Sequence, residues 1–144
     1  MKTACWRRRK SMARLSESSN DSSAAGGLEG MRILYVEDDE DVRELTAEML
    51  KMLGCEIRCL PTADDAVRES LDGYDLLLSD VRMPGSMDGI ELARWATVHY
   101  PALPILLVSG YFSAPERLDD LQVKVLRKPY TLDALHKTML AEYR

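Results

Sequence analysis

Long hydrophobic runs are missing from this sequence of 144 residues. The longest apolar stretch, Leu103 to Val108, contains a proline and is far too short to cross a bilayer, so we expect no membrane contact. Cysteine is scarce, because only Cys5, Cys55 and Cys59 are present and no secretory signal precedes them. We therefore expect reduced thiols and a cytoplasmic location. No Cys or His lies near enough to complete a metal site with Cys55 and Cys59, and we interpret this pair as buried strand thiols.

Positive charge is also scarce over most of the chain. The net charge is −5, and residues 1–30 carry six basic and three acidic side chains, so residues 31–144 carry the remaining −8. An acidic body lacks the clustered Lys and Arg that bind nucleic acid phosphates, so we expect no direct nucleic acid partner. The one basic run, residues 7–10, has no amphipathic or apolar neighbour. We interpret it as a solvated tail.

Residues 15–30, LSESSNDSSAAGGLEG, are rich in Ser, Gly and polar side chains and offer almost nothing to bury. We predict that residues 1–30 form a flexible leader and that one folded domain occupies residues 31–144. Met31 opens the first predicted strand directly. An alternative interpretation is therefore that translation begins at Met31 and that the leader is a non-native extension.

From Met31 onward, short apolar runs alternate with helical patterns, which is typical of a parallel sheet covered by helices. Pairs of a capping residue and an acid three positions later predict three helix starts: Thr62 with Asp65, Asp88 with Glu91, and Ser113 with Glu116. Apolar stripes predict two further helices: Val42, Leu45, Met49 and Leu53, and then Leu132, Leu135 and Met139. The predicted strands are 32–36, 55–60, 75–79, 104–108 and 123–126.

This alternation predicts an α/β fold with a doubly wound, five-stranded parallel sheet. Right-handed crossovers most simply give the strand order 2-1-3-4-5, in which the first and third strands are neighbours. In such sheets, ligands bind at the carboxyl ends of the strands, where the strand order reverses. We therefore expect the functional residues directly after the strands.

Acidic side chains follow the first and third strands. Glu37, Asp38 and Asp39 come directly after the first strand, and Asp80 comes directly after the third. Such an acidic run is most often only a solvated helix start. In this topology, however, Glu37, Asp38 and Asp80 should converge, and carboxylates about 4 Å apart repel by roughly 4 kcal/mol at an effective dielectric near 20. All-oxygen ligands at an open site favour Mg²⁺, or Mn²⁺, with phosphate oxygens completing the shell.

Two further polar residues follow the fourth and fifth strands, namely Ser109 and Lys128. A hydroxyl donor and a positive charge are what the equatorial oxygens of a transferring phosphoryl group need. Lys128 alone would be an ordinary surface lysine. Its position, at the same edge as the acidic cluster, indicates phosphoryl chemistry.

Taken together, residues 31–144 resemble the receiver domains of two-component response regulators, which have a flavodoxin-like (β/α)5 fold. YVEDD resembles the metal-binding pair of this family, and DLLLSDVRMPGSMDG resembles its phosphoacceptor signature. The resemblance implies that Asp80 is the phosphoacceptor. It further implies metal binding by Glu37, Asp38, Asp80 and the backbone carbonyl of Arg82, a hydroxyl role for Ser109, a charge role for Lys128, and a cis peptide bond between Lys128 and Pro129.

The sequence departs from the family pattern in three places. Gly85 and Ser86 lengthen the loop after Asp80 by one residue, as in receivers attached to hybrid sensor kinases. The predicted fourth helix, within residues 111–124, has only about two turns. Val125 replaces an aromatic residue that is common in the family, so we expect the phosphorylation signal to leave through a backbone shift of this helix.

The function predicted from these residues is that of a stand-alone receiver. It accepts a phosphoryl group from a sensor histidine kinase or a histidine phosphotransfer protein, and it signals through contacts with an unknown downstream protein. It is not a classical turnover enzyme. The alternatives fit less well: VEDDE does not match the DxDx(T/V) motif of haloacid dehalogenase-type phosphohydrolases, and a flavin module needs a phosphate loop where these acids lie. The complete residue set also argues against a pseudo-receiver that binds partners without phosphorylation.

Overall fold

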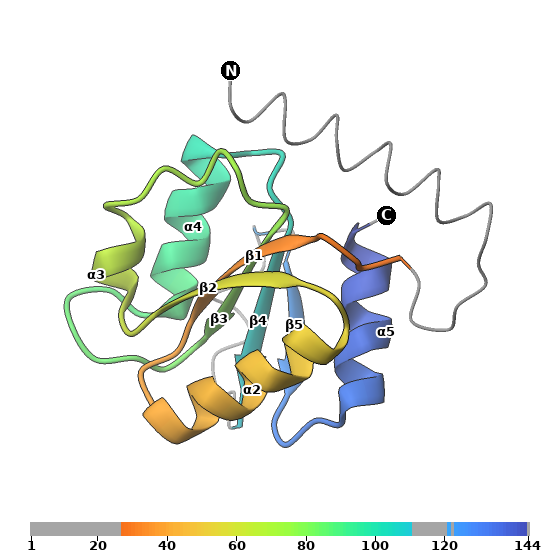
Figure 1. The fold of residues 1–144 in the computed structure, drawn as a ribbon. Coiled ribbons are helices and arrows are strands. Elements are labelled where there is room, and N and C mark those ends of the chain that lie inside the picture. The colour runs from red at the N-terminus through yellow and green to blue at the C-terminus, as the bar shows by residue number, and fades with distance from the viewer. Residues whose placement is uncertain (1–26, 111–120, 122, 144) are drawn as a thin grey trace.

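The computed structural model describes residues 27–110, 121 and 123–143. Five strands form one parallel sheet in the order β2-β1-β3-β4-β5, which confirms the predicted fold class and strand order (Figure 1). Four strands begin one residue later than predicted, and the first has the predicted bounds. The strands are β1 Arg32–Val36, β2 Glu56–Leu60, β3 Leu76–Asp80, β4 Ile105–Ser109 and β5 Lys124–Arg127.

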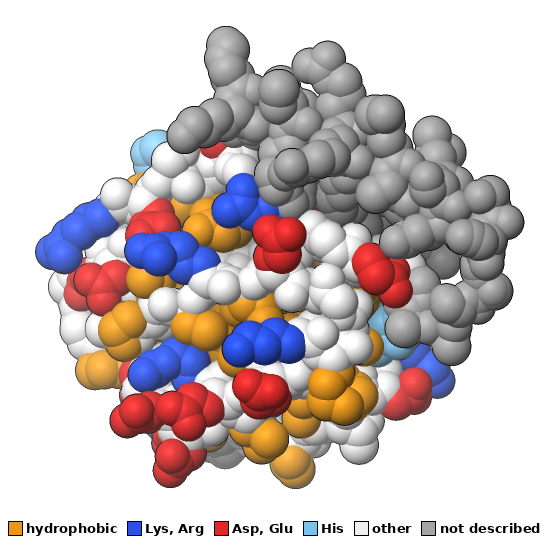
Figure 2. All heavy atoms as spheres, in the orientation of Figure 1, with side chains coloured by type: hydrophobic (Ala, Val, Ile, Leu, Met, Phe, Trp, Pro, Cys, Tyr) orange, Lys and Arg blue, Asp and Glu red, His pale blue; other side chains and the backbone are white. Residues whose placement is uncertain are grey.

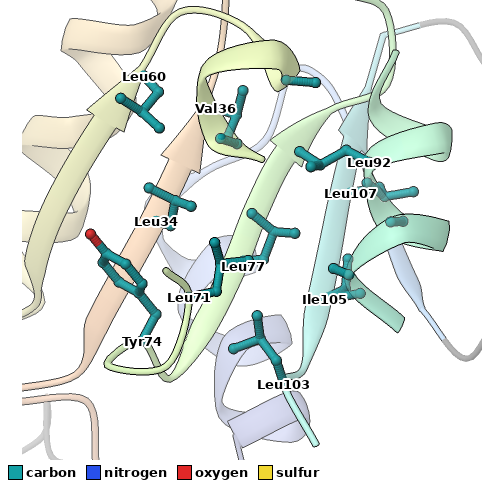
Figure 3. Packing of buried hydrophobic residues seen from close by; sticks show 14 of the residues in the cluster. Leu34, Val36, Leu60, Leu71, Tyr74, Leu77, Leu92, Leu103, Ile105 and Leu107 are labelled. Atoms are coloured by element: carbon teal, nitrogen blue, oxygen red, sulfur yellow. The ribbon is translucent and has the colours of Figure 1, made fainter. Parts of the chain in front are cut away.

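Helices cover both faces of the sheet (Figure 1). They are α2 Glu40–Met52, α3 Ala63–Ala66, α4 Gly89–His99 and α5 Leu132–Tyr143. Side chains of α3 and α4 pack on one face of the sheet, around the residues drawn in Figure 3, and side chains of α2 and α5 pack on the other. The central strands β3 and β4 are buried along their whole length, which explains why they are continuous apolar runs in the sequence. No helix within the described residues is long and apolar enough to cross a membrane.

Capping residues begin the helices where the sequence predicts. Thr62 Oγ1 accepts a hydrogen bond from the Asp65 amide at 3.1 Å. Asp88 and Glu91 form a reciprocal capping box with two hydrogen bonds of 2.9 Å. Asp39 Oδ1 likewise accepts from the Val42 amide at 3.1 Å and starts α2. The start predicted at Ser113 lies outside the described residues.

Two side chains differ from their predicted positions. Leu45 was expected in the buried stripe of its helix, but it is 61% exposed, because α2 buries Thr46, Ala47 and Leu50 instead. Cys59 was expected to be a buried strand thiol, and it is exposed, whereas Cys55 is buried as predicted. Cys59 lies in β2, an edge strand with a neighbouring strand on one side only, and this lowers its burial.

The folded domain also begins earlier than predicted. Residues 27–30 were assigned to the leader, but Leu28 is fully buried in the cluster between the sheet and helices α2 and α5. The Gly30 amide donates to the Gly54 carbonyl at 2.8 Å, and the Met31 amide donates to the Leu28 carbonyl at 3.0 Å. The predicted start at Met31 is therefore too late. Residues 1–26 lie outside the described residues, and their assignment as a leader stays a prediction.

Two of the exposed positions of the outer strand β2, Glu56 and Arg58, carry charged side chains. Arg58 donates from Nε and Nη2 to the two carboxylate oxygens of Glu69, at 2.8 and 2.6 Å. Glu56 Oε1 lies 3.7 Å from Nε of Arg32 in the neighbouring strand. Acidic and basic side chains are intermingled on the face of the molecule drawn in Figure 2.

Candidate functional site

Three carboxylates meet where β1 and β3 end. Glu37 and Asp38 directly follow β1, and Asp80 is the last residue of β3, which pairs in parallel with β1. One carboxylate oxygen from each of the three residues lies within 4.8 Å of the others. Glu37 and Asp80 are buried, while Asp38 is exposed. The convergence predicted from the strand order is therefore present.

Lys128 joins this cluster from the end of β5. Its Nζ lies 3.1 Å from Glu37 Oε1 and 3.3 Å from Asp80 Oδ1, so one ammonium group contacts two of the three carboxylates. The peptide bond from Lys128 to Pro129 is cis, as the family resemblance implies. Counting the described residues, three acidic groups and one basic group therefore meet here, and their summed formal charge is negative.

Burial shapes the protonation of these groups. Desolvation raises the pKa of Glu37, and the nearby charge of Asp80 raises it further, while hydrogen bonds from Asp39 and Lys128 oppose the shift. Desolvation also raises the pKa of Asp80, against the attraction of Lys128. Burial opposes the charged form of Lys128, but Asp80 and Glu37 together raise its pKa. The cluster holds more negative charge than its surroundings stabilise, and a divalent cation would compensate it.

Ser109 and Arg82 lie on neighbouring parts of the same edge. Ser109 is the last residue of β4 and is buried, and its carbonyl accepts a hydrogen bond from the Lys128 amide at 3.0 Å. Val108, the residue before it, pairs with Asp80. Arg82 lies in the loop two residues beyond Asp80, and its side chain is exposed. Ser109 thus lies at the end of the strand that neighbours β3, and Arg82 lies two residues after Asp80 in the sequence. Their roles stay predictions.

Val125 lies in β5 and packs, partly buried, against the hydrophobic cluster on the α3 and α4 face. Leu121 packs against the same cluster. The helix expected within residues 111–124 falls mostly on positions 111–120 and 122, which lie outside the described residues. Its proposed shift upon phosphorylation stays a prediction.

The sequence reasoning missed two residues that support the cluster. Arg43 on α2 donates from Nη1 to the Glu37 carbonyl at 2.7 Å and so ties the end of β1 to the helix. Gly89 begins α4 against the backbone of Asp80: a Cβ atom at Gly89 would collide with the Asp80 carbonyl oxygen and lie 2.8 Å from the Val81 Cα. Nothing in the sequence singles out Arg43. A glycine directly after the capping residue Asp88 was a usable signal, because glycine is a poor helix former.

Comparisons with known proteins agree with this geometry. The sequence model described as "Response regulator receiver domain" matches residues 33–140. The response regulator receiver protein CpdR of Brucella abortus is 37% identical over 105 residues, which cover 70% of this chain and 87% of that protein. The transcriptional regulatory protein DctD of Rhizobium meliloti is 31% identical over 107 residues, which cover 72% of this chain but only 23% of that protein.

Solved structures show the same architecture. The response regulator TrrA of Thermotoga maritima, solved in complex with Mg²⁺ and BeF, superposes with a TM-score of 0.69 at 29% identity, over 76% of this chain and 96% of that one. The chemotaxis protein CheY4 of Vibrio cholerae superposes with a TM-score of 0.72 over 78% of this chain and 98% of that one. Its identity of 24% supports the fold alone.

Proposed function

Because the chain belongs to the response regulator receiver domain family, we propose that it accepts a phosphoryl group on Asp80 and signals through contacts that depend on this phosphorylation. Receiver domains are signalling domains of two-component systems. One observation carries the assignment of the site: Glu37, Asp38 and Asp80 converge at one edge of the sheet, and Lys128 contacts two of them.

In the proposed reaction, a carboxylate oxygen of Asp80 attacks the phosphorus of a phosphohistidine in line with the P–N bond. The new P–O bond forms as the P–N bond breaks, the imidazole nitrogen of the partner keeps the electron pair, and an acyl phosphate results. Lys128 is already 3.3 Å from Asp80 Oδ1, and its ammonium group would stabilise the added negative charge. The hydroxyl of Ser109 would donate to a phosphoryl oxygen. Attack by water on the acyl phosphate would then restore Asp80.

The residues present fit a divalent cation. Three carboxylates offer oxygen ligands within 4.8 Å of one another, and within the described part of the chain the ammonium group of Lys128 is the one cation that contacts two of them. Glu37, Asp38, Asp80 and the backbone carbonyl of Arg82 would hold Mg²⁺, or Mn²⁺, since hard cations prefer oxygen ligands. When bound, the cation would supply charge stabilisation for the phosphoryl oxygens. The Thermotoga maritima relative, solved with Mg²⁺ and BeF, supports this choice.

The proposed partners follow from the phosphohistidine chemistry. We expect the donor to be a sensor histidine kinase or a histidine phosphotransfer protein, and the output to be an unknown downstream protein in the cytoplasm. The match to most of the length of the Brucella receiver protein supports stand-alone action. The chain spans about a quarter of DctD, so the activity of that longer regulator is not transferred to this chain. The net charge of −8 over residues 31–144 supports the absence of a direct nucleic acid contact.

Phosphorylation with a small-molecule phosphodonor and Mg²⁺ tests the proposal. Intact mass spectrometry should show one added phosphoryl group in the native protein and none in Asp80→Asn, while Asp72→Asn, an exposed acid on a loop, should behave like the native protein. Circular dichroism confirms that each variant is folded. Undiminished phosphorylation of Asp80→Asn would refute the assignment of the acceptor.

A further inference from the structure

A hydrogen bond between two hydroxyl groups links helix α2 to the segment that carries Lys128. Thr46 Oγ1 and Tyr130 Oη are 2.8 Å apart, although the residues are 84 positions apart in the sequence. We propose that this hydrogen bond holds Lys128 in place, which makes Thr46 and Tyr130 positioning residues for phosphoryl transfer. The inference rests on the proposed function of Asp80 and Lys128.

The hydrogen bond is partly buried. Thr46 is 2% exposed, and Tyr130 packs, partly buried, against the hydrophobic cluster between the sheet and helices α2 and α5. Desolvation raises the pKa of Tyr130, so the phenol keeps its proton at neutral pH and remains available as a donor or acceptor. A buried hydroxyl that loses its partner is costly, so the bond restrains both elements.

The segment from Lys128 to Tyr130 is held at both of its ends. The Lys128 amide donates to the Ser109 carbonyl of β4 at 3.0 Å, and the Tyr130 hydroxyl is bonded to α2. Between these two anchors the Lys128 side chain extends to Glu37 and Asp80. Releasing the Tyr130 anchor would remove the hydrogen bond that ties this short segment to α2.

Helix α2 is bound to the acidic side of the site as well. Arg43, one turn before Thr46, donates to the Glu37 carbonyl at 2.7 Å. Glu37 in turn contacts Lys128 at 3.1 Å. The interactions therefore close a ring that runs from Glu37 through α2 to Tyr130 and back through Lys128. A closed ring fixes the relative position of the ammonium group and the carboxylates more firmly than the ion pair alone.

The ring matters for the reaction because it aligns the Lys128 ammonium group with Asp80. Lys128 can stabilise the transferring phosphoryl group only if its Nζ stays beside Asp80, and displacements of about 1 Å at a reaction centre cost up to about 100-fold in rate. Because Lys128 keeps its ion pairs when the ring opens, we expect a smaller loss, of about tenfold, in the rate of phosphorylation.

Matched variants test the inference. Thr46→Val keeps the shape of the side chain and removes the hydroxyl, Thr46→Ser keeps the hydroxyl, and Tyr130→Phe removes the other partner. We measure the rate of phosphorylation by phosphoramidate at saturating Mg²⁺, with thermal unfolding as a check of folding. Thr46→Val and Tyr130→Phe should each lose about tenfold in rate, Thr46→Ser should stay near the native rate, and the double variant Thr46→Val/Tyr130→Phe should lose no more than either single variant.

A second series asks whether the effect passes through Lys128. In a Lys128→Gln background the added Tyr130→Phe change should leave the residual rate unchanged, because the group that it positions is already gone. An undiminished tenfold loss in that background would overturn the inference, as would native rates for Thr46→Val and Tyr130→Phe. A native protein that gains no phosphoryl group would instead refute the proposed function, and the inference with it.

Discussion

Replacing Asp38 by Asn tests the electrostatic account of the acidic cluster, because it removes one negative charge and almost no volume. Asp38 offers an oxygen within 4.8 Å of oxygens of Glu37 and Asp80. At that separation, two unit charges repel by about 3.5 kcal/mol at an effective dielectric of 20 and by about 0.9 kcal/mol in bulk water. Asp38 is exposed, so the lower figure is the better guide. We expect Asp38→Asn to stabilise the metal-free protein by about 1 kcal/mol.

The same substitution should weaken the response to Mg²⁺. A cation at ten times its dissociation constant stabilises the native protein by about 1.4 kcal/mol through mass action. For a domain of this size, 1 kcal/mol corresponds to a change in Tm of about 4 °C. The native protein should therefore gain about 6 °C on addition of Mg²⁺, while Asp38→Asn should start about 4 °C higher in a chelator and gain little.

Thermal unfolding in a chelator and across a Mg²⁺ titration measures both effects. Asp72→Asn, which removes an exposed charge from a loop, controls for the change in net charge. The decisive feature is a higher Tm in the chelator together with a smaller gain from Mg²⁺, since a general loss of structure would lower Tm in both conditions. If Asp38→Asn lowered Tm in the chelator and kept the full gain with Mg²⁺, both the repulsion and the ligand role of Asp38 would be refuted.

Three further predictions concern pH, packing and the start of the domain. The pKa values of Glu37 and Asp80 are raised, which means that the folded state binds these protons more tightly than the unfolded state. The stability of the metal-free protein should therefore fall as pH rises above about 4, and the gain in stability from Mg²⁺ should grow. Equal gains from Mg²⁺ at pH 4 and pH 7 in thermal unfolding would contradict this. Gly89→Ala should lower the free energy of unfolding in urea by more than about 2 kcal/mol, because the new Cβ meets the backbone of Asp80 and Val81. In the control Gly73→Ala, the new Cβ would make an ordinary contact at 3.5 Å, and the loss should be less than about 1 kcal/mol. Similar losses in the two variants would be inconsistent with the close approach at Gly89. A chain that starts at residue 27 should keep the full Tm. A chain that starts at residue 31 lacks the buried Leu28, and its free energy of unfolding should be lower by about 2–5 kcal/mol. Equal stabilities of the two chains would argue against a role of Leu28 in the core.

The order of the strands and the convergence of Glu37, Asp38 and Asp80 were predictable because both follow from local patterns. Each strand is a short apolar run with a clear boundary, and parallel topology places the residues after β1 and β3 side by side. The positions of Glu37 and Asp80 relative to the strand ends are enough to predict that they meet. The distances from Lys128 were not predictable, since a flexible side chain with four methylene groups reaches many positions.

The features that were missed depend on contacts between distant parts of the chain. Leu28 lies in a stretch of Gly, Ser and Ala that looks like a linker, and only the folded structure shows that it is buried in a hydrophobic cluster. The Thr46 and Tyr130 hydroxyls belong to segments with no local signal that connects them. Leu45 matched a helical stripe in the sequence, but the orientation of α2 on the sheet, which buries Thr46 and Ala47, decides which side of the helix is covered.

The charged side chains of the outer strand β2 bear on how this protein avoids unwanted self-association. An outer strand offers backbone groups to which a second chain can add as a further strand, and charged side chains on its exposed positions discourage such growth. Glu56 and Arg58 lie on β2, and Arg58 is held by two hydrogen bonds to Glu69. Addition of a strand to β2 would either separate Arg58 from Glu69 or bring the added chain close to these charges. Contacts that come and go with phosphorylation are therefore better made by side chains elsewhere on the surface, where they remain reversible and do not seed aggregates.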